Sequence, residues 1–226
     1  MRLRSIPSVI SGGGRGTPLE PAGMLRGNES IASAIANSSQ DYRTVRLAHD
    51  TWNVGGTITV SDDNVTISGC GTGTVLQLER GVNAALLSVT GDNVTIENIA
   101  FQTESGTGAS PEYAISITGS RVTVRNCTFD GFYRTILASA NTYMIIEGCR
   151  FKSQAAGCID MNNTDYSVVR GNIIETNASG NEIDLDANCQ YNTVYGNVAV
   201  GGAISISTSG GQANKYAANS PAATTT

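Results

Sequence analysis

Hydrophobic and polar residues alternate in a short phrase that returns six times along the middle of the chain. The phrases occupy residues 64–70, 93–99, 121–127, 143–149, 166–172 and 191–197. A Gly or Asn marks the end of each phrase, at positions 69, 98, 126, 148, 171 and 196, so the period drifts between 22 and 29 residues. One strand-like phrase per repeat of this length is typical of a solenoid. The β-branched residues and the period-two alternation favour strands over helices, so the pattern predicts a β-solenoid.

Equal positions of the phrases are expected to stack, because neighbouring strands of a parallel sheet lie about 4.8 Å apart. Two residues before the marker, the column is aliphatic: Ile67, Ile96, Val124, Ile146, Val169 and Val194. Four residues before it, apolar character weakens toward the end: Val65, Val94, Val122, Met144, Ser167 and Asn192. Three residues after the marker, the column is Phe101, Phe129, Phe151, Ile174 and Ala199. One residue after the marker, it is Cys70, Ile99, Cys127, Cys149, Asn172 and Asn197. The alignment therefore predicts an inward aliphatic ladder, a Phe stack and a Cys column that becomes a two-rung Asn ladder.

A second strand per repeat lies between the markers. Its predicted inward column is Ile115, Ile136, Ile159, Ile183 and Ile204. With these ladders, residues 28–207 resemble the right-handed parallel β-helix of the pectate-lyase and phage-tailspike superfamily. The resemblance implies an all-β, single-stranded right-handed parallel β-helix of about seven coils. It implies a fold, and an activity does not follow from it.

The two ends of the chain differ from the repeats. Residues 1–27 contain three prolines and the run Gly12–Gly14, and they are expected to form an extended N-terminal arm. A short helix over residues 31–37, N-capped by Ser30, is expected to cap the open end of the β-helix domain, residues 28–207. Residues 208–226 are predicted to be a low-complexity C-terminal tail. The arm lacks the apolar run of a signal peptide, so secretion by that route is not expected.

Charge and cysteine content narrow the possible functions. The net charge is −5, divided into +3 over residues 1–27 and −8 over the rest. An acidic body does not suit nucleic-acid binding, which depends on neutralising phosphates, and no membrane contact is expected. The five cysteines include no CxxC pair, so no metal or other cofactor is expected. Free buried thiols are the favoured interpretation, although Cys127 and Cys149 could pair if their coils are adjacent.

Candidate chemistry is confined to carboxylates of the second strand. Asp160 and Asp184 each follow an inward Ile, so they are expected to point outward on successive coils, and Glu182 and Asp186 share the face of Asp184. Carboxylates about 5 Å apart match the spacing of a retaining glycosidase pair, and they could also hold Ca²⁺. A solvated or interface role for these side chains is the alternative. If the protein is an enzyme, Asp160, Asp184 and Asp186 are its predicted catalytic residues.

Motifs of the related enzymes are incomplete. The resemblance implies, for polygalacturonases, an Asn-Thr-Asp, an Asp-Asp, a His-Gly and an Arg-Ile-Lys segment in that order. Residues 163–165 read Asn-Thr-Asp, but the only Asp-Asp, at 62–63, lies upstream. The single His49 is followed by Asp, and no Arg-Ile-Lys occurs. These departures argue against that activity.

Three hypotheses for the function remain. The first is a non-catalytic virion protein of a tailed phage, a capsid decoration or spike-like β-helix made in the host cytoplasm. It would attach to the major capsid protein or another virion protein through Arg2, Arg4, Arg15 and Arg26 of the arm, and the resemblance implies a homotrimer. Exposed tyrosines could anchor its contacts. The second is a polysaccharide depolymerase or lyase, and the third is a glycan-binding module that recognises a surface polysaccharide.

Overall fold

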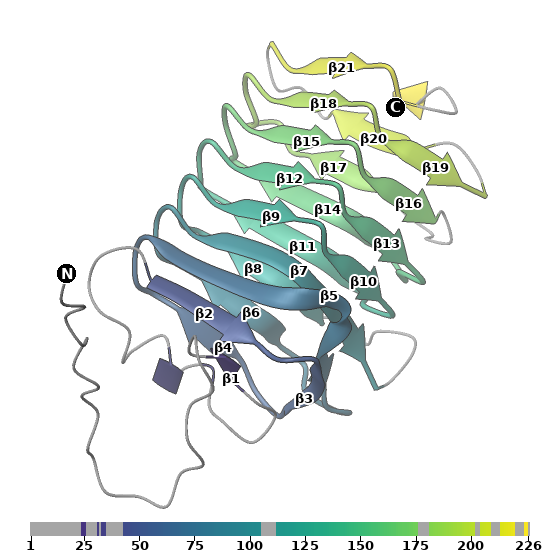
Figure 1. Ribbon diagram of the computed structural model, residues 1–226. Helices are drawn as coiled ribbons and strands as arrows, with labels where there is room; N and C mark the ends of the chain where they lie inside the picture. Colours follow the sequence, from purple (N-terminus) through teal and green to yellow (C-terminus); the bar gives the residue numbers. More distant parts are fainter. Residues whose placement is uncertain are drawn as a thin grey trace, which may run out of the picture.

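Each turn of the chain adds short strands to two parallel sheets, and the turns stack along one axis (Figure 1). The computed structural model describes residues 24–25, 31, 33–34, 43–104, 112–175, 181–201, 204–208, 213–219 and 224–225. All strand pairs are parallel, and the strands make about six turns where about seven were expected. The predicted fold class is confirmed, and the described residues include no helix long and apolar enough to cross a membrane.

Within the described residues, sheet A has fourteen strands and sheet B has eight. The strands of sheet A are β1 (Met24–Leu25), β2 (Arg43–Leu47), β3 (Asp50–Val54), β5 (Val65–Leu78), β7 (Thr95–Thr103), β9 (Thr123–Arg125), β10 (Thr128–Asp130), β12 (Ile145–Glu147), β13 (Arg150–Lys152), β15 (Val168–Arg170), β16 (Ile173–Glu175), β18 (Thr193–Tyr195), β19 (Val198–Val200) and β21 (Lys215–Ala217). The strands of sheet B are β4 (Ile58–Val60), β6 (Ala85–Val89), β8 (Tyr113–Ile117), β11 (Arg134–Ser139), β14 (Gly157–Asn162), β17 (Ile183–Leu185), β20 (Ser205–Thr208) and β22 (Thr224–Thr225).

Sheet A divides above β7 into two branches, because the marker residue bends the chain in each later turn. The markers Asn98, Asn126, Gly148, Gly171 and Gly196 all have φ between 53° and 65°. This left-handed region is open to Gly and tolerated by Asn, which favours these two residue types at the markers. One branch runs β9-β12-β15-β18-β21 and the other β10-β13-β16-β19.

The predicted columns form the interior. Phe101, Phe129 and Phe151 are fully buried and stack with ring centroids 5.0 Å apart at both contacts. Ile174 and Ala199 continue this column, as predicted. The aliphatic ladder from Ile67 to Val194 is also in the predicted register, rung by rung.

Asparagine replaces apolar side chains at two inward columns of the later turns. Asn172 donates from Nδ2 to Oδ1 of Asn197 at 2.9 Å, and Asn197 donates in turn to Oδ1 of Asn219 at 3.0 Å. The predicted two-rung ladder is therefore extended by a third rung. The column four residues before the marker loses its apolar character in the later turns, but its polar residues also form a ladder. The backbone N–H of Ser167 donates to Oδ1 of Asn192 at 2.8 Å. Asn214 continues this second ladder by accepting from the backbone N–H of Asn192.

Two predicted register positions are wrong. Cys70 is exposed, because β5 bulges between Ser68 and Val75 and the turn with positive φ falls on Gly71. Buried Thr74 takes the interior place, accepting from the N–H of Cys70 and donating to a backbone carbonyl. In sheet B, Ile183 pairs with Ile206 where Ile204 was predicted. All five cysteines are free, and Cys127 and Cys149 do not pair covalently. The prediction of buried thiols is confirmed for four of them and is wrong for the exposed Cys70.

The chain ends were predicted from composition. Residues 1–27 lie outside the described residues except for β1, which pairs with β2 at the edge of sheet A. Of the predicted helix 31–37, the structure describes Ile31, Ser33 and Ala34, whose backbone is helical, and Ile31 is buried in the core. Arg2, Arg4, Arg15 and Arg26 lie outside the described residues.

Candidate functional site

The predicted carboxylate pair lies on neighbouring strands of sheet B. Asp160 in β14 is directly in register with Asp184 in β17, as predicted. Asp160 is only 7% exposed, and Arg134 of β11 forms an ion pair with it. Burial raises the pKa of Asp160, with Asp184 and Asp186 adding to the effect and the Arg134 guanidinium opposing it. A carboxyl group with a raised pKa beside a second carboxyl group has the features of a general acid, but Asp160 is already engaged by Arg134.

The other two acidic residues have structural partners. Oδ1 of Asp186 accepts the backbone N–H groups of Asn163 at 3.0 Å and Asn188 at 2.9 Å. Partial burial opposes ionisation of Asp186, but these donors outweigh it and lower its pKa. Glu182 is buried and accepts the backbone N–H of Ser205 at 2.7 Å. Both side chains therefore connect neighbouring turns, and only the pair Asp160–Asp184 remains a candidate for chemistry.

A charged column crosses the outer face of sheet A. Six of its members lie one residue before a marker, in register across neighbouring strands: Ser68, Glu97, Arg125, Glu147, Arg170 and Tyr195. Arg46 on β2 begins the column, in register with Ser68. Arg125 pairs with Glu97 at 2.6 Å and Arg170 pairs with Glu147 at 2.5 Å. Among the described residues, Arg46 at the end of the column has no ion-pair partner. The alternating charges can be recognised in the sequence, because they lie at a fixed distance from the marker. An analysis of the inward columns alone does not find them.

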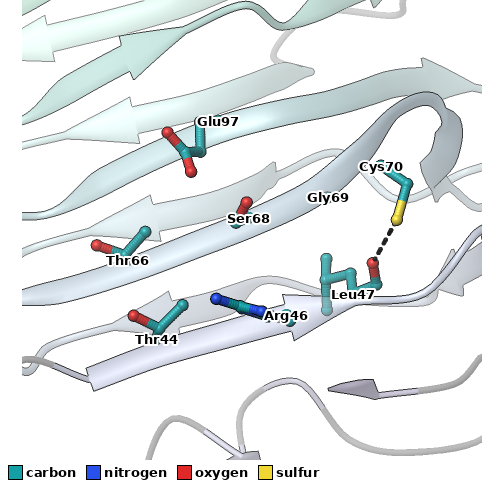
Figure 2. A pocket seen from close by; sticks show the side chains of 8 residues that line it. All are labelled: Thr44, Arg46, Leu47, Thr66, Ser68, Gly69, Cys70 and Glu97. Atoms are coloured by element: carbon teal, nitrogen blue, oxygen red, sulfur yellow. Dashed lines mark hydrogen bonds between the residues drawn. The ribbon is translucent and has the colours of Figure 1, made fainter. Parts of the chain in front are cut away.

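A polar hollow of about 380 Å³ surrounds Arg46. Figure 2 shows its lining side chains rising from three neighbouring strands, with Arg46 on β2, Ser68 on β5 and Glu97 on β7. The hydroxyl groups of Thr44 and Thr66 line the same hollow. At one end lies the thiol of Cys70, directed at the carbonyl oxygen of Leu47 at 3.5 Å. The hollow thus combines a guanidinium without an ion-pair partner in the described chain with three hydroxyl groups.

A second hollow of about 430 Å³ lies further along the charged column. Glu147, Arg170 and Tyr195 line it together with Asn126 and three marker glycines at 148, 171 and 196. Here the Arg170 guanidinium donates to the Tyr195 hydroxyl at 3.0 Å as well as to Glu147. Hydrogen bonds from Arg170 to the Tyr195 hydroxyl and to Glu147 raise the pKa of the guanidinium, so this cation is fixed and satisfied. The hollow is less suited to a charged ligand than the one around Arg46.

An exposed aromatic stack borders the same face of sheet A. Tyr143, Tyr166 and Tyr191 are 54%, 47% and 51% exposed, and their rings stack at centroid distances of 5.4 and 4.9 Å. All three have φ between 54° and 60°. A non-glycine residue in this region costs about 1–3 kcal/mol, whereas an aromatic pair contributes about 0.5–1.5 kcal/mol. Stacking of the rings therefore offsets part of the cost of this conformation.

The earlier turns carry polar residues at this position. Asn64, Asn93 and Arg121 occupy the column before Tyr143, also with positive φ. Nδ2 of Asn93 donates to Oδ1 of Asn64 at 3.2 Å, and Nε of Arg121 donates to Oδ1 of Asn93 at 2.7 Å. The column therefore changes from a polar ladder to an aromatic one half-way along the solenoid.

The sequence profile of the right-handed beta helix region matches residues 51–220. The chain belongs to this family. The family assignment, together with the parallel sheets, confirms the β-helix part of the resemblance, while a phage origin remains a prediction. The described residues of this β-helix protein contain no cluster of His, Cys, Asp and Glu that could hold a metal ion.

Solved structures of β-helix proteins match most of the chain. The pectin methylesterase from Aspergillus niger is 16% identical, with a TM-score of 0.60 over 89% of this chain and 86% of that one. Pectin methylesterase PemA from Erwinia chrysanthemi is 10% identical, with a TM-score of 0.53 over 86% of this chain and 66% of that one. At such identities the similarity shows the fold alone. No curated protein sequence matches this β-helix protein.

Proposed function

We propose that the protein binds a polysaccharide along the N-terminal half of the outer face of sheet A. This polar half comprises the threonine column Thr44, Thr66, Thr95 and Thr123 and the adjoining charged column from Arg46 to Arg125. The observation that carries the proposal is the hollow around Arg46, with its three neighbouring hydroxyl groups. Hydroxyl and guanidinium groups donate hydrogen bonds to the hydroxyl, ring and carboxylate oxygens of sugars.

The geometry of the solenoid favours a polymeric ligand. Equivalent side chains recur on successive strands about 4.8 Å apart along the axis. A chain of similar sugar units lying along that axis meets a comparable set of donors at each turn, so weak contacts add up by effective concentration. The matched pectin methylesterases, one of them crystallised in complex with a hexasaccharide, support the class of ligand by analogy only.

The test is binding to a panel of neutral and acidic polysaccharides, measured by affinity electrophoresis and calorimetry. Arg46→Gln is expected to weaken binding at least tenfold, because it removes the charged donor of the hollow. Arg150→Gln is the matched control: Arg150 is similarly exposed but pairs with Glu175 on the other branch of sheet A. Equal binding by wild type and Arg46→Gln would refute the site, and no binding to any polysaccharide would refute the function.

Cleavage of a polysaccharide at Asp160 and Asp184 is a second candidate function, and it would take place on sheet B, apart from the binding face proposed on sheet A. The raised pKa of Asp160, beside a carboxylate one strand away, favours it. Release of reducing ends or unsaturated products from the same panel would be measured for wild type, Asp160→Asn and Asp184→Asn. Asp130→Asn, which alters a surface ion pair with Lys152, is the control. Product release that both variants retain would exclude the pair from catalysis.

A further inference from the structure

The two hollows of sheet A lie along one column of side chains. The strands that carry this column follow one another along the axis in the order β2, β5, β7, β9, β12, β15 and β18 (Figure 1). The first hollow surrounds Arg46 on β2, and the second is lined by Arg170 on β15 and Tyr195 on β18. Arg46 and Arg170 are thus five strand spacings of about 4.8 Å apart, or about 24 Å.

Glycines make the floor of the second hollow, which we call the glycine hollow. Gly148, Gly171 and Gly196 are the markers of three consecutive turns. Among the described atoms, a Cβ atom added at Gly171 would have no neighbour within 4 Å, and one added at Gly196 would have a single neighbour at 3.9 Å. Their φ of 62° and 65° also admits asparagine, which the same column carries at 98 and 126. Packing therefore does not require glycine at these two positions, and its effect is to leave the backbone open to a ligand.

The polar side chains of the glycine hollow retain one acceptor and one donor. Arg170 donates to Oε2 of Glu147 from Nε at 2.8 Å and from a terminal nitrogen at 2.5 Å, so within the described chain no residue donates to Oε1. The Tyr195 hydroxyl accepts from Arg170 at 3.0 Å, and its own hydrogen remains available to another acceptor. The hollow thus presents a carboxylate oxygen and a phenolic O–H side by side on neighbouring strands.

This pair of groups selects a ligand that carries hydroxyl groups. A hydroxyl both donates and accepts, so it can satisfy Glu147 and Tyr195 together. A carboxylate or sulfate group only accepts and would be repelled by Glu147, and an ammonium group would lie against Arg170. On the other branch of sheet A, Ile173 and Val198 follow the floor glycines by two residues and are 39% and 43% exposed. Apolar surface beside a few placed polar groups is typical of ligand sites, and it matches the C–H faces and hydroxyl edges of a sugar ring.

We propose that the glycine hollow is a second subsite of the glycan site, which binds an uncharged sugar unit of the same chain that Arg46 binds. This inference rests on the proposed function and defines its class of ligand. The ligand is a chain that spans about 24 Å along the axis, with uncharged units over the later turns, and its acidic groups, where it has them, lie at Arg46. Joining two subsites through one chain raises the affinity by effective concentration.

Calorimetry with chains of graded length tests the second subsite. The probes are dextran and xylan as neutral chains, and glucuronoxylan and alginate as acidic ones, each also as fragments. Affinity is expected to rise with fragment length until the fragment reaches both hollows. The double variant Gly171→Asn, Gly196→Asn fills the floor and is expected to weaken binding of long fragments at least tenfold, while short fragments held at Arg46 bind as before. Gly81→Asn is the matched control, since Gly81 also has positive φ and open space around it but lines neither hollow.

A second variant keeps the test decisive if the double variant folds poorly by circular dichroism. Tyr195→Phe removes only the hydroxyl group and is expected to weaken binding of long fragments at least threefold, without an effect on short ones. Wild-type affinity of a folded variant for long fragments would overturn the inference, whereas Arg46→Gln reports separately on the proposed function. Tighter binding of alginate, which has a carboxylate on every unit, than of glucuronoxylan would overturn the class of ligand. No binding of any probe would refute both the function and the subsite.

Discussion

Replacing Phe129 by alanine tests the register of the solenoid most directly. Its ring is fully buried and lies between Phe101 and Phe151, with centroids 5.0 Å away on each side. A buried Phe→Ala substitution costs about 3–5 kcal/mol. Loss of two aromatic contacts, each about 0.5–1.5 kcal/mol, places the expected destabilisation in the upper part of that range.

Phe132→Ala separates stacking from burial. Phe132 is equally buried but belongs to no aromatic stack among the described residues. We therefore expect it to cost less than Phe129→Ala, about 3–4 kcal/mol, the lower part of the same range. Phe129→Leu, which keeps most of the volume, is expected to lie below both.

The assay is equilibrium unfolding in urea followed by two signals. Two signals are needed because solenoids can unfold in parts. Far-UV circular dichroism reports all turns, whereas fluorescence of the single Trp52, buried in β3, reports the first turns. Both midpoints are expected to fall for Phe129→Ala if the turns unfold together. An unchanged circular dichroism midpoint would show that Phe129 is not at the centre of the stack.

Four further predictions follow from other contacts. Asn172→Ala removes the acceptor of the buried Cys149 N–H, so we expect a loss of about 1–3 kcal/mol in urea unfolding, and no loss would contradict the ladder. A thiol reagent is expected to label Cys70 rapidly and the other four cysteines only on unfolding, with Cys70→Ser lacking the fast phase. Because the pKa of Asp186 is lowered, its stabilisation is present above the ordinary Asp pKa of about 3.9 and is lost as pH falls below it, so Asp186→Asn should flatten the acid limb of stability against pH. Deletion of residues 1–23, which spares β1, is expected to leave the β-helix folded but abolish attachment to virions if the protein is a decoration protein, and undiminished attachment would remove the arm from that hypothesis.

Much of the interior could be predicted because parallel stacking repeats one simple rule. Side chains alternate with period two, and a Gly or Asn with positive φ marks each bend. Together these place Phe101, Phe129 and Phe151 above one another from the sequence alone. The alternation rule does not fix the register where two residues of one strand, two positions apart, are both apolar. Ile204 and Ile206 both point inward, and a slip of two residues changes no face.

Local insertions and long-range packing were not predictable. The run from Gly69 to Gly73 allows β5 to bulge, which moves Cys70 to the surface, and no pattern within one phrase reveals it. The outward direction of Asp160 follows from alternation, but its burial and its pairing with Arg134 depend on how neighbouring turns cover the sheet. The sequence did not identify Arg46 as a site residue for another reason. Arg46 is of interest because it has no ion-pair partner in the described structure, and ion pairing cannot be read from a sequence.

The unequal lengths of the strands predict how the molecule responds to tension along its axis. β5 and β7 are paired over eight positions, whereas most later strands of sheet A are joined to each neighbour by two or three. Each turn holds only the turns next to it, so a force pulling the ends apart loads these pairings in series. The later turns would detach one by one, and the paired β5 and β7 would be the last to yield. The pairing of β5 with β7 thus forms a mechanical anchor, and the later turns form a sequence of extensible links.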